Sequence, residues 1–264
     1  MWQSILIVAV PLLDIWTIGR AILRGHGVQG TIAWVMTIIA FPVFGALLYF
    51  ALASPSVKRL KIRKQRAAQT IRATVGPEPE PAVPLHPLMD LAASLTDMEP
   101  TSGNEATLLA ENDLAFRAIE EAMEAAEHRI WAEYYMVRND ETGHRFLDIL
   151  LERARAGVEV LFIHDAVGSA GLDASRLDSI RDAGGQVVAF HPVNPLKHRW
   201  SVHLRNHKKL VIVDDTIGFT GGMNVGDEYS GRRRFRGKAS FRDTHLMIRG
   251  PAVHDLARTF LEDW

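Results

Sequence analysis

The residues from Gly27 to Val57 include no charged side chain, which restricts how this part of the chain can fold. A helix needs about 20 apolar residues to cross the hydrocarbon core of a bilayer, and Thr31–Ala53 is such a run, with Pro42 inside it. In lipid a proline is tolerated because neighbouring groups satisfy the carbonyl that it frees. We therefore predict a transmembrane helix rather than a helix of a protein core, because core helices of this length usually carry charge.

A second apolar segment, Met1–Gly19, precedes this run and contains Asp14. An Asp in the middle of a membrane helix costs about 2.5–3.5 kcal/mol, whereas each Leu, Ile, Val or Phe returns about 0.3–0.6 kcal/mol. The segment holds enough of these residues to offset the Asp, so we predict a two-helix transmembrane hairpin over residues 1–55. A signal peptide is the alternative, but no Lys or Arg precedes the apolar run.

Basic residues cluster directly after the predicted hairpin. Loops rich in Lys and Arg stay on the cytoplasmic side, and the connection between the two helices carries only Arg20 and Arg24. We therefore expect a multi-pass protein of the inner (cytoplasmic) membrane whose catalytic domain is cytoplasmic. The cluster would also attract anionic headgroups, at about 1 kcal/mol per residue. Its members are Lys58, Arg59, Lys61, Arg63, Lys64, Arg66 and Arg72.

Residues 56–100 are predicted to form a basic and proline-rich cytoplasmic linker. Its segment 76–87 reads GPEPEPAVPLHP, and such proline spacing favours extended geometry and excludes a helix. From about residue 101 to residue 264 helical and strand patterns alternate, which predicts an α/β domain with a mixed or mainly parallel sheet. The expected helices are 114–128, 143–156, 174–183 and 251–264, and the expected strands are 130–137, 158–164, 186–190, 209–213, 218–220 and 245–248.

Composition excludes several kinds of chemistry. The chain has no cysteine, so disulfides, thiol nucleophiles and thiolate zinc sites are all excluded. Its net charge of -1 gives no reason to expect a nucleic-acid partner. The reactive groups must come from His, Lys, Asp, Glu, Ser or Tyr.

One segment collects such groups around a short apolar strand. His207 and Lys209 are two residues apart, so on an extended chain their side chains point to the same face. Asp214 ends the strand, and the glycine pair 221–222 follows after a turn, where a backbone without side chains can approach an anion. Asn224 lies just beyond and offers two amide donors. This combination suits a site for a tetrahedral phosphate.

These residues form a recognisable pattern. The segment 207–214, HKKLVIVD, followed by GGMN at 221–224, is the His-x-Lys-x-x-x-x-Asp signature of the phospholipase D superfamily. The paired N-terminal helices and several flanking segments resemble bacterial cardiolipin synthases, and the resemblance covers nearly the whole chain. Those segments are EYY at 133–135, DAVGS at 165–169, RN at 205–206, RDTH at 242–245, GPAV at 250–253 and FLEDW at 260–264.

The resemblance implies a role for each residue of the motif. His207 would attack phosphorus and form a phosphohistidine, or would protonate the leaving alcohol. Lys209 and Asn224 would hold the non-bridging oxygens, together with the backbone of Gly222. Asp214 would act mainly on structure and local charge. No metal or other cofactor is needed, because Lys and Asn supply the positive field.

Neighbouring residues receive supporting roles. A catalytic imidazole is oriented by an acidic group, and we expect Asp243 to be that group. His203 and His245 match no catalytic position of the family, so we expect structural or supporting roles for both. Tyr134 and Tyr135 are expected in the core and in the wall of the groove.

Cardiolipin synthases carry two such motifs in a chain nearly twice as long, and this chain carries one. The site would therefore be completed by a missing second half or by a homodimer with one His207 from each copy. The expected function is a phosphatidyltransferase that acts on phosphatidylglycerol at a membrane. The alternatives are a phospholipase D, a nuclease-type phosphodiesterase and an inactive membrane module.

Overall fold

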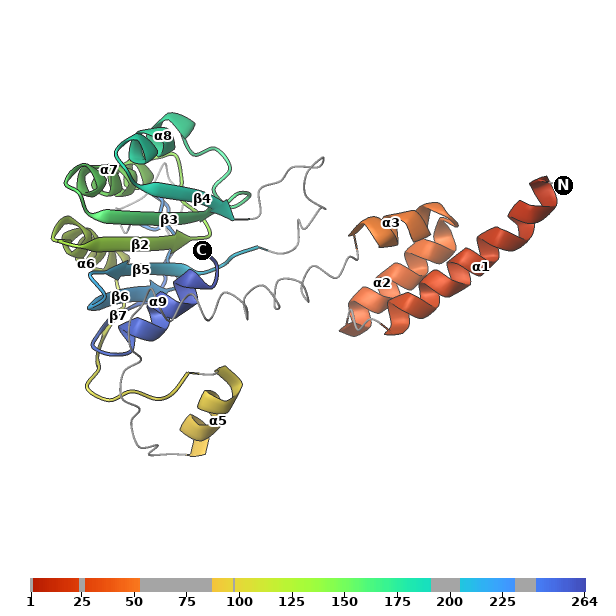
Figure 1. Cartoon of the computed structure of the whole chain (residues 1–264), viewed down its shortest axis with the longest axis horizontal. Coiled ribbons are helices and arrows are strands. Elements are labelled where there is room, and N and C mark those ends of the chain that lie inside the picture. Colours follow the sequence, from red (N-terminus) through yellow and green to blue (C-terminus); the bar gives the residue numbers. More distant parts are fainter. Residues whose placement is uncertain (1, 24–26, 53–86, 97, 191–204, 231–240) are drawn as a thin grey trace. The chain divides into compact units, whose positions relative to one another are not determined.

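The computed structural model describes residues 2–23, 27–52, 87–96, 98–190, 205–230 and 241–264 (Figure 1). The basic cluster after residue 57, the proline-rich stretch up to residue 86 and His203 lie outside the described residues. The chain divides into two compact units, one built from the N-terminal helices and one α/β unit that holds the motif.

The N-terminal unit contains three helices, α1 (Trp2–Leu23), α2 (Gly27–Ala40) and α3 (Phe44–Leu52). The single helix predicted over residues 31–53 is wrong, because the chain breaks between α2 and α3. Pro42 lies in this break, and a proline ring prevents the helix from continuing. Among the helices that the structure describes, none combines the length and the apolar character needed to cross a membrane.

The break explains a carboxylate in an otherwise apolar helix. Val43 has a φ of 65°, in the left-handed region that β-branched residues rarely adopt. Its N–H donates to Oδ1 of Asp14 on α1 at 3.2 Å. Trp16, also on α1, stacks on Phe50 of α3 with ring centroids 5.6 Å apart. Polar and aromatic contacts thus join α1 to the two shorter helices.

The α/β unit contains one sheet of seven strands in the described residues, in the order β1-β7-β6-β5-β2-β3-β4. β2, β3 and β4 are parallel, and the remaining neighbours pair antiparallel. This mixed sheet confirms the α/β part of the predicted fold. The strands are β1 (Glu105–Leu109), β2 (Arg129–Tyr134), β3 (Glu159–Asp165), β4 (Gln186–Phe190), β5 (Lys209–Val213), β6 (Ile217–Gly221) and β7 (His245–Arg249).

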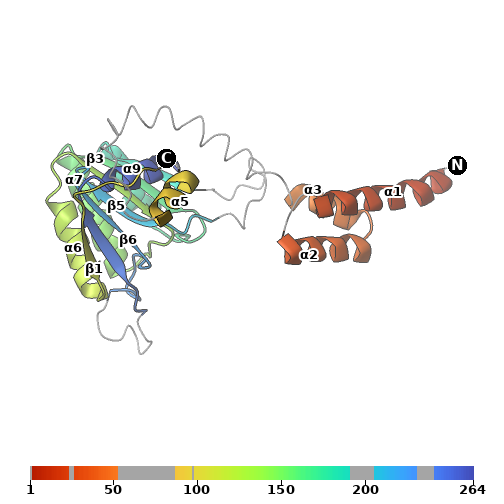
Figure 2. The ribbon, with the colours of Figure 1, turned by 90° about the horizontal axis from the view of Figure 1, so that it is seen from below.

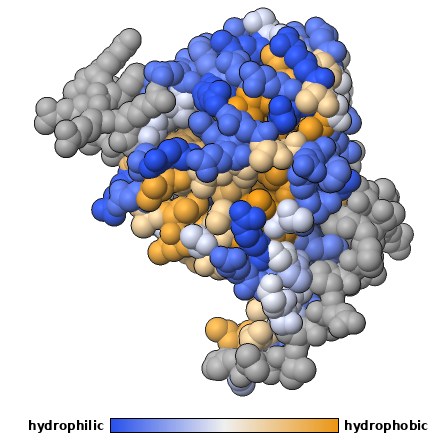
Figure 3. Space-filling view, turned by 90° about the vertical axis from the view of Figure 1, so that its left-hand side faces the viewer, coloured by the Kyte–Doolittle hydropathy of each residue, from blue (hydrophilic) through white to orange (hydrophobic). Residues whose placement is uncertain are grey.

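Helices cover both faces of the sheet (Figures 1 and 2). The larger core lies under α6 (Asn112–Glu124), α7 (Glu141–Arg155) and α8 (Ala174–Asp182). The smaller core lies under α9 (Val253–Leu261), where Phe260 stacks on Trp131 with ring centroids 5.4 Å apart. On the outer surface, hydrophilic side chains surround a band of hydrophobic ones (Figure 3).

Side chains along the central strands point alternately to the two faces of the sheet, and this determines which of the two cores each one joins. In β2, Ile130, Ala132 and Tyr134 join the larger core, whereas Trp131 joins the smaller one. Successive side chains of a strand point to opposite faces. Glu133 therefore points to the α9 face, and in β5 the side chain of Lys209 shares the opposite face with those of the larger core.

The sequence patterns did not predict two of the elements in the structure. β1 is an edge strand with a single neighbour, β7, and its EATLL sequence is too short and too polar to stand out. The other is α5 (Pro87–Thr96), which lies within the predicted linker. Pro87 was expected to exclude a helix but occupies the first helical position, where its missing N–H has no intrahelical partner to lose.

Candidate active site

All the predicted site residues except Asp214 gather at one end of the central strands. The end of β2 pairs with the start of β5 through Tyr134 and Lys209, and the end of β6 pairs with the start of β7 through Gly221 and His245. His207 lies two residues before Lys209, just outside this end. The parallel strands β2, β3 and β4 end here as well, and ligands of α/β sheets typically bind beyond the carboxyl ends of the strands.

His207 is exposed, and one face of its ring is covered. The imidazole stacks on the ring of Tyr135, with centroids 4.0 Å apart and planes 15° apart. Lys209 Nζ donates to the backbone oxygen of His207 at 2.8 Å and lies 5.5 Å from the Tyr135 ring centroid. The structure thus brings the His and the Lys of the motif together, and it places Tyr135 against both.

Lys209 is half-buried and faces a carboxylate. Burial lowers the pKa of the Lys209 amine, and the carboxylate of Asp243 acts in the opposite direction. Asp243 also lies against Gly222, where an added Cβ would be 2.5 Å from its Oδ1. The absence of a side chain at Gly222 therefore makes room for Asp243, a role that spacing alone did not indicate. Among the described residues Asp243 forms no hydrogen bond with His207, so its predicted role in orienting the imidazole stays a prediction.

Asn224 is buried close to the same end of the strands. Its Nδ2 donates to the hydroxyl of Tyr229 at 3.0 Å, and its Oδ1 has no hydrogen-bond partner among the described residues. Buried polar atoms without a partner are rare in folded proteins. Tyr229 holds the carboxamide in place, and the second N–H of Nδ2 is the donor suited to an anionic ligand.

Asp214 lies apart from the other predicted site residues, at the opposite end of β5. Its carboxylate accepts hydrogen bonds from the N–H groups of Glu127, His128 and Arg129, at 2.9, 2.8 and 2.8 Å. Burial acts to raise the pKa of Asp214, but these hydrogen bonds outweigh it and lower the pKa. The carboxylate of Asp214 therefore holds the turn that leads into β2, and the role predicted for this residue in the site stays a prediction.

Asn112 is a buried residue of the site that the sequence did not reveal. It begins α6, and its Nδ2 donates to the backbone oxygens of Tyr229 and Phe241 at 2.7 and 2.9 Å. Its Oδ1 accepts the N–H of Asp243 at 3.0 Å. One side chain thereby connects the segment that holds Asn224 to the segment that holds Asp243. A lone Asn near a helix start is common as a cap, so no sequence signal distinguished it.

The loop after β3 supports Tyr135. Asp165 is fully buried and accepts the N–H groups of Val167 and Gly168, both at 2.9 Å. An added Cβ at Gly168 would lie 2.3 Å from the backbone oxygen of Tyr135. Ser169 Oγ donates to the same oxygen at 3.2 Å. This loop, noted in the sequence as DAVGS, thus acts by holding the residue that stacks on the motif His.

His245 is fully buried beside the site and is neutral at physiological pH. Burial lowers the pKa of its imidazole to about 4, and the ammonium of Lys209 adds to this effect. An added Cβ at Gly221 would lie 2.7 Å from His245 Nδ1, so this glycine gives the ring its space. Neither ring nitrogen has a hydrogen-bond partner among the described residues.

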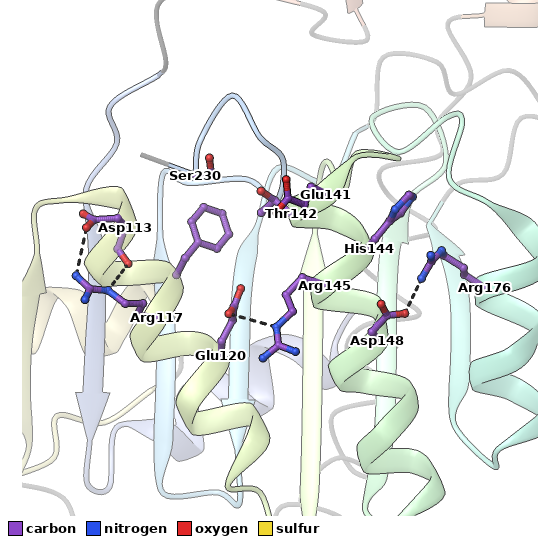
Figure 4. A pocket seen from close by; sticks show the side chains of 11 residues that line it. Asp113, Arg117, Glu120, Glu141, Thr142, His144, Arg145, Asp148, Arg176 and Ser230 are labelled. Carbon is purple, nitrogen blue, oxygen red and sulfur yellow. Dashed lines mark hydrogen bonds and ion pairs between the residues drawn. The ribbon is translucent and has the colours of Figure 1, made fainter. Parts of the chain in front are cut away.

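A cavity of about 570 Å³ lies between α6 and α7, away from the motif (Figure 4). Its arginines point to carboxylates: Arg117 pairs with Asp113 at 3.2 Å, and Arg145 with Glu120 at 3.6 Å. None of the predicted site residues lines it. Among the described residues no three His, Asp or Glu side chains are grouped as a metal site would require.

Comparison with known proteins gives a consistent result. The family model described as "Cardiolipin synthase, PLD-like domain" matches residues 119–264, and the model "Phospholipase_D-nuclease N-terminal" matches residues 12–53. The cardiolipin synthase of Geobacillus kaustophilus is 35% identical in an alignment 242 positions long that covers 89% of this chain and 48% of that protein. The cardiolipin synthase of Halalkalibacterium halodurans is 33% identical in an alignment 276 positions long, gaps included, that covers 100% of this chain and 54% of that protein.

Among solved structures, the phospholipase D family member Nuc of Salmonella typhimurium has a TM-score of 0.45 and 18% identity, over 61% of this chain and 91% of its own. The chain spans about half the length of the two cardiolipin synthases. The match of the domain model covers more than half of the chain and includes the whole motif. The chain therefore belongs to the cardiolipin synthase family of the phospholipase D superfamily.

Proposed function

We propose that the chain provides one half of a phosphatidyltransferase site that makes cardiolipin from phosphatidylglycerol. The observation that carries this proposal is the grouping of an exposed His207, the ammonium of Lys209 and the buried carboxamide of Asn224, an N–H donor, at one end of the strands. Membership in the cardiolipin synthase family supports a phospholipid as the phosphodiester.

In the proposed reaction a ring nitrogen of His207 attacks the phosphorus of phosphatidylglycerol. A nitrogen–phosphorus bond forms, the bond from phosphorus to the glycerol oxygen breaks, and the glycerol oxygen takes up a proton. The hydroxyl of a second phosphatidylglycerol then attacks the phosphohistidine and gives its proton to the group that had protonated the glycerol. The phosphorus–nitrogen bond breaks, which restores the imidazole and gives cardiolipin. Lys209 and Asn224 stabilise the charge on the non-bridging oxygens during both steps.

A second acidic group must give the leaving glycerol its proton, because His207 cannot be nucleophile and acid at once. We propose that a second motif supplies it, either from a second copy of this chain or from a further half. The chain spans about half the length of its relatives, which supports a second motif on another polypeptide segment. In a homodimer the two His207 side chains would face each other across the two-fold axis.

We also propose that the N-terminal unit attaches the protein to the inner membrane, with the α/β unit on the cytoplasmic side. Apolar side chains are exposed on all three helices, and lipid hydrocarbon is the partner that fits them. The basic residues that follow residue 57 would add attraction to anionic lipids. The exposed side chains include Leu12, Ile15, Trp16, Ile32, Met36, Phe44 and Leu47.

The full chain in detergent, incubated with phosphatidylglycerol, tests these proposals. Cardiolipin plus glycerol is the expected product pair, whereas phosphatidic acid would identify a hydrolase that uses water. His207→Asn should abolish the product, and His128→Asn, a change at an exposed histidine, should not. A rate that rises more steeply than the protein concentration would support a homodimer. Absence of any lipid turnover at high concentration would contradict the proposed activity for the chain on its own.

A further inference from the structure

A cluster of polar side chains lies beneath the motif, on the face of the sheet that α9 covers. It consists of Glu133 on β2, Asn206 and Lys208 on either side of His207, and Asp263 after α9, and is called the carboxylate clamp below. Glu133 and Asn206 are buried, at 0% and 6% exposure, and the side chain of Asp263 is 4% exposed. None of these residues belongs to the four fixed positions of the motif.

Asn206 uses its side chain and its backbone to fix the chain before His207. Its Nδ2 donates to Glu133 Oε1 and, at 3.1 Å, to Asp263 Oδ2. Its Oδ1 accepts the N–H of Lys208 at 3.0 Å, and its own N–H donates to Asp165 Oδ2 at 3.2 Å. Asn206 is therefore hydrogen-bonded to four other residues.

Lys208 fixes the chain after His207. Its Nζ pairs with Asp263 Oδ2, donates to the backbone oxygen of Thr259 at 3.2 Å and lies 4.0 Å from Glu133 Oε1. Its backbone oxygen accepts the N–H of Tyr135 at 3.1 Å. The nucleophile thus lies between two residues that are both held from the opposite face of the sheet.

The carboxyl groups of Glu133 and Asp263 both lie against the ammonium of Lys208. Glu133 Oε2 is buried without a hydrogen-bond partner among the described residues. An ionised carboxylate in that position would carry a large desolvation cost. Burial raises the pKa of Glu133 to about 8, Lys208 acts to lower it, and the carboxylate of Asp263 acts to raise it.

We propose that Glu133, as a neutral carboxylic acid next to the Asp263 carboxylate, is a positioning residue for His207. The pair holds Asn206 and Lys208, and through them it fixes the backbone of the nucleophile that lies between. The effect on catalysis rests on the proposed function, because only a reaction at His207 makes its position matter. A shift of about 1 Å in a reacting group is enough to reduce a rate about 100-fold.

Two variants of one residue separate a neutral acid from an ionised one. Gln at position 133 offers a donor and an acceptor, as a protonated carboxyl group does, whereas Ala offers neither. Glu133→Gln should keep kcat for cardiolipin formation within about twofold, and Glu133→Ala should lower it about tenfold or more with KM little changed. The alkaline limb of the wild-type pH profile, near pH 8, should move to higher pH in the Gln variant.

A readout without lipid distinguishes failure of this inference from failure of the proposed function. In the full chain in detergent with ¹³C-labelled histidine, the His207 resonance is assigned by its loss in His207→Asn. Its chemical shift should stay at the wild-type value in Glu133→Gln and change in Glu133→Ala. If the His207 chemical shift changed equally in Glu133→Gln and Glu133→Ala, and both variants unfolded at the wild-type temperature, the inference would be overturned. So would a wild-type His207 resonance in the Ala variant. A wild-type chain without lipid turnover would contradict only the proposed function.

Discussion

The imidazole of His207 and the phenol ring of Tyr135 lie nearly parallel, with centroids 4.0 Å apart. The stack covers one face of the motif histidine, which is an exposed residue. Tyr135 is itself held, since its N–H donates to Lys208 O at 3.1 Å and its backbone oxygen accepts from Ser169 Oγ at 3.2 Å. The histidine is thereby restricted to few orientations before a substrate arrives.

Replacing Tyr135 tests this platform. Tyr135→Phe keeps the ring and should keep the rate of lipid turnover within about twofold. Tyr135→Ala removes a contact of a kind worth about 0.5–1.5 kcal/mol, which corresponds to a rate about 2- to 12-fold lower. Initial rates with phosphatidylglycerol measure both. Equal rates for the Ala and Phe variants would show that the stack does not restrict the nucleophile.

The pair of Asp243 and Lys209 predicts a pH effect. The carboxylate opposes the lowering of the Lys209 pKa by burial, so Asp243→Asn should lower that pKa further. Lys209 would then lose its charge at lower pH. In a Glu133→Gln background, where position 133 no longer ionises, the alkaline limb of the kcat/KM profile should therefore move to lower pH. Asp178→Asn, which removes an exposed ion pair with Arg181, serves as the control. An unchanged profile in Asp243→Asn would contradict both this coupling and the predicted orienting role.

Asp214 is expected to act on stability rather than on chemistry. Asp214→Ala removes three hydrogen bonds to backbone N–H groups and should lower the free energy of unfolding by about 1–3 kcal/mol. Its folded pKa is lowered, so this stabilisation is present above the ordinary carboxylate pKa and is lost as the pH falls through the folded pKa. Urea unfolding at several pH values measures the effect.

Asp215→Ala is the matched control, because both residues have a positive φ, 49° for Asp214 and 57° for Asp215. Asp215 pairs with Arg129 at the surface, at 3.1 Å, and such pairs contribute about 0–1 kcal/mol. If Asp214→Ala abolished turnover and left the unfolding free energy unchanged, the residue would be catalytic after all.

Asn112 should be sensitive to substitution although it lies outside the motif. Asn112→Ala leaves one buried carbonyl oxygen, one partly buried carbonyl oxygen and one N–H without their partner and should destabilise the fold by about 2–3 kcal/mol. Asn104→Ala, at an exposed residue whose Oδ1 accepts one N–H from Ala252, should cost less than about 1 kcal/mol. Thermal unfolding compares them, and equal costs would contradict a central role for Asn112.

The break at Pro42 gives a prediction for the N-terminal unit. Asp14→Asn keeps an oxygen that can accept the Val43 N–H, whereas Asp14→Leu removes it. Hydrogen exchange measured by mass spectrometry in detergent should therefore show protection of the Val43 amide in the wild type and in Asp14→Asn. Protection should be lost in Asp14→Leu, and a protected amide there would mean that the carboxylate does not cap the break.

The sequence predicted the α/β unit well because the information was local. The β5 and β4 bounds match the expected strands, and the motif places His207 and Lys209 on one face through the two-residue period of a strand. The edge strand β1 and the helix that begins at Pro87 were missed. The pattern of β1 is weak because this strand depends on pairing with a segment distant in the chain. The helix is hard to recognise because it begins with a proline, which a helix tolerates at its first position.

The site was less predictable than the motif. Spacing assigned a ligand role to Gly222, but contact with Asp243 is what the structure shows. Asn112 had no local signal and Glu133 was noted only as part of the EYY segment, because both act through contacts with segments far away in the sequence. Periodicity reveals which face a side chain occupies, but not which distant group it meets there.

Selection is expected to act differently on the residues at the two ends of β5. His207 and Lys209 would be retained only while the chemistry is useful, whereas Asp214 would be retained as long as the strand must join the start of β2. In a descendant that had lost activity, substitutions should therefore accumulate at His207 and Lys209 before they accumulate at Asp214. A relative that keeps the aspartate but has lost the histidine should still fold. The aspartate in such a sequence would indicate common descent, not catalytic activity.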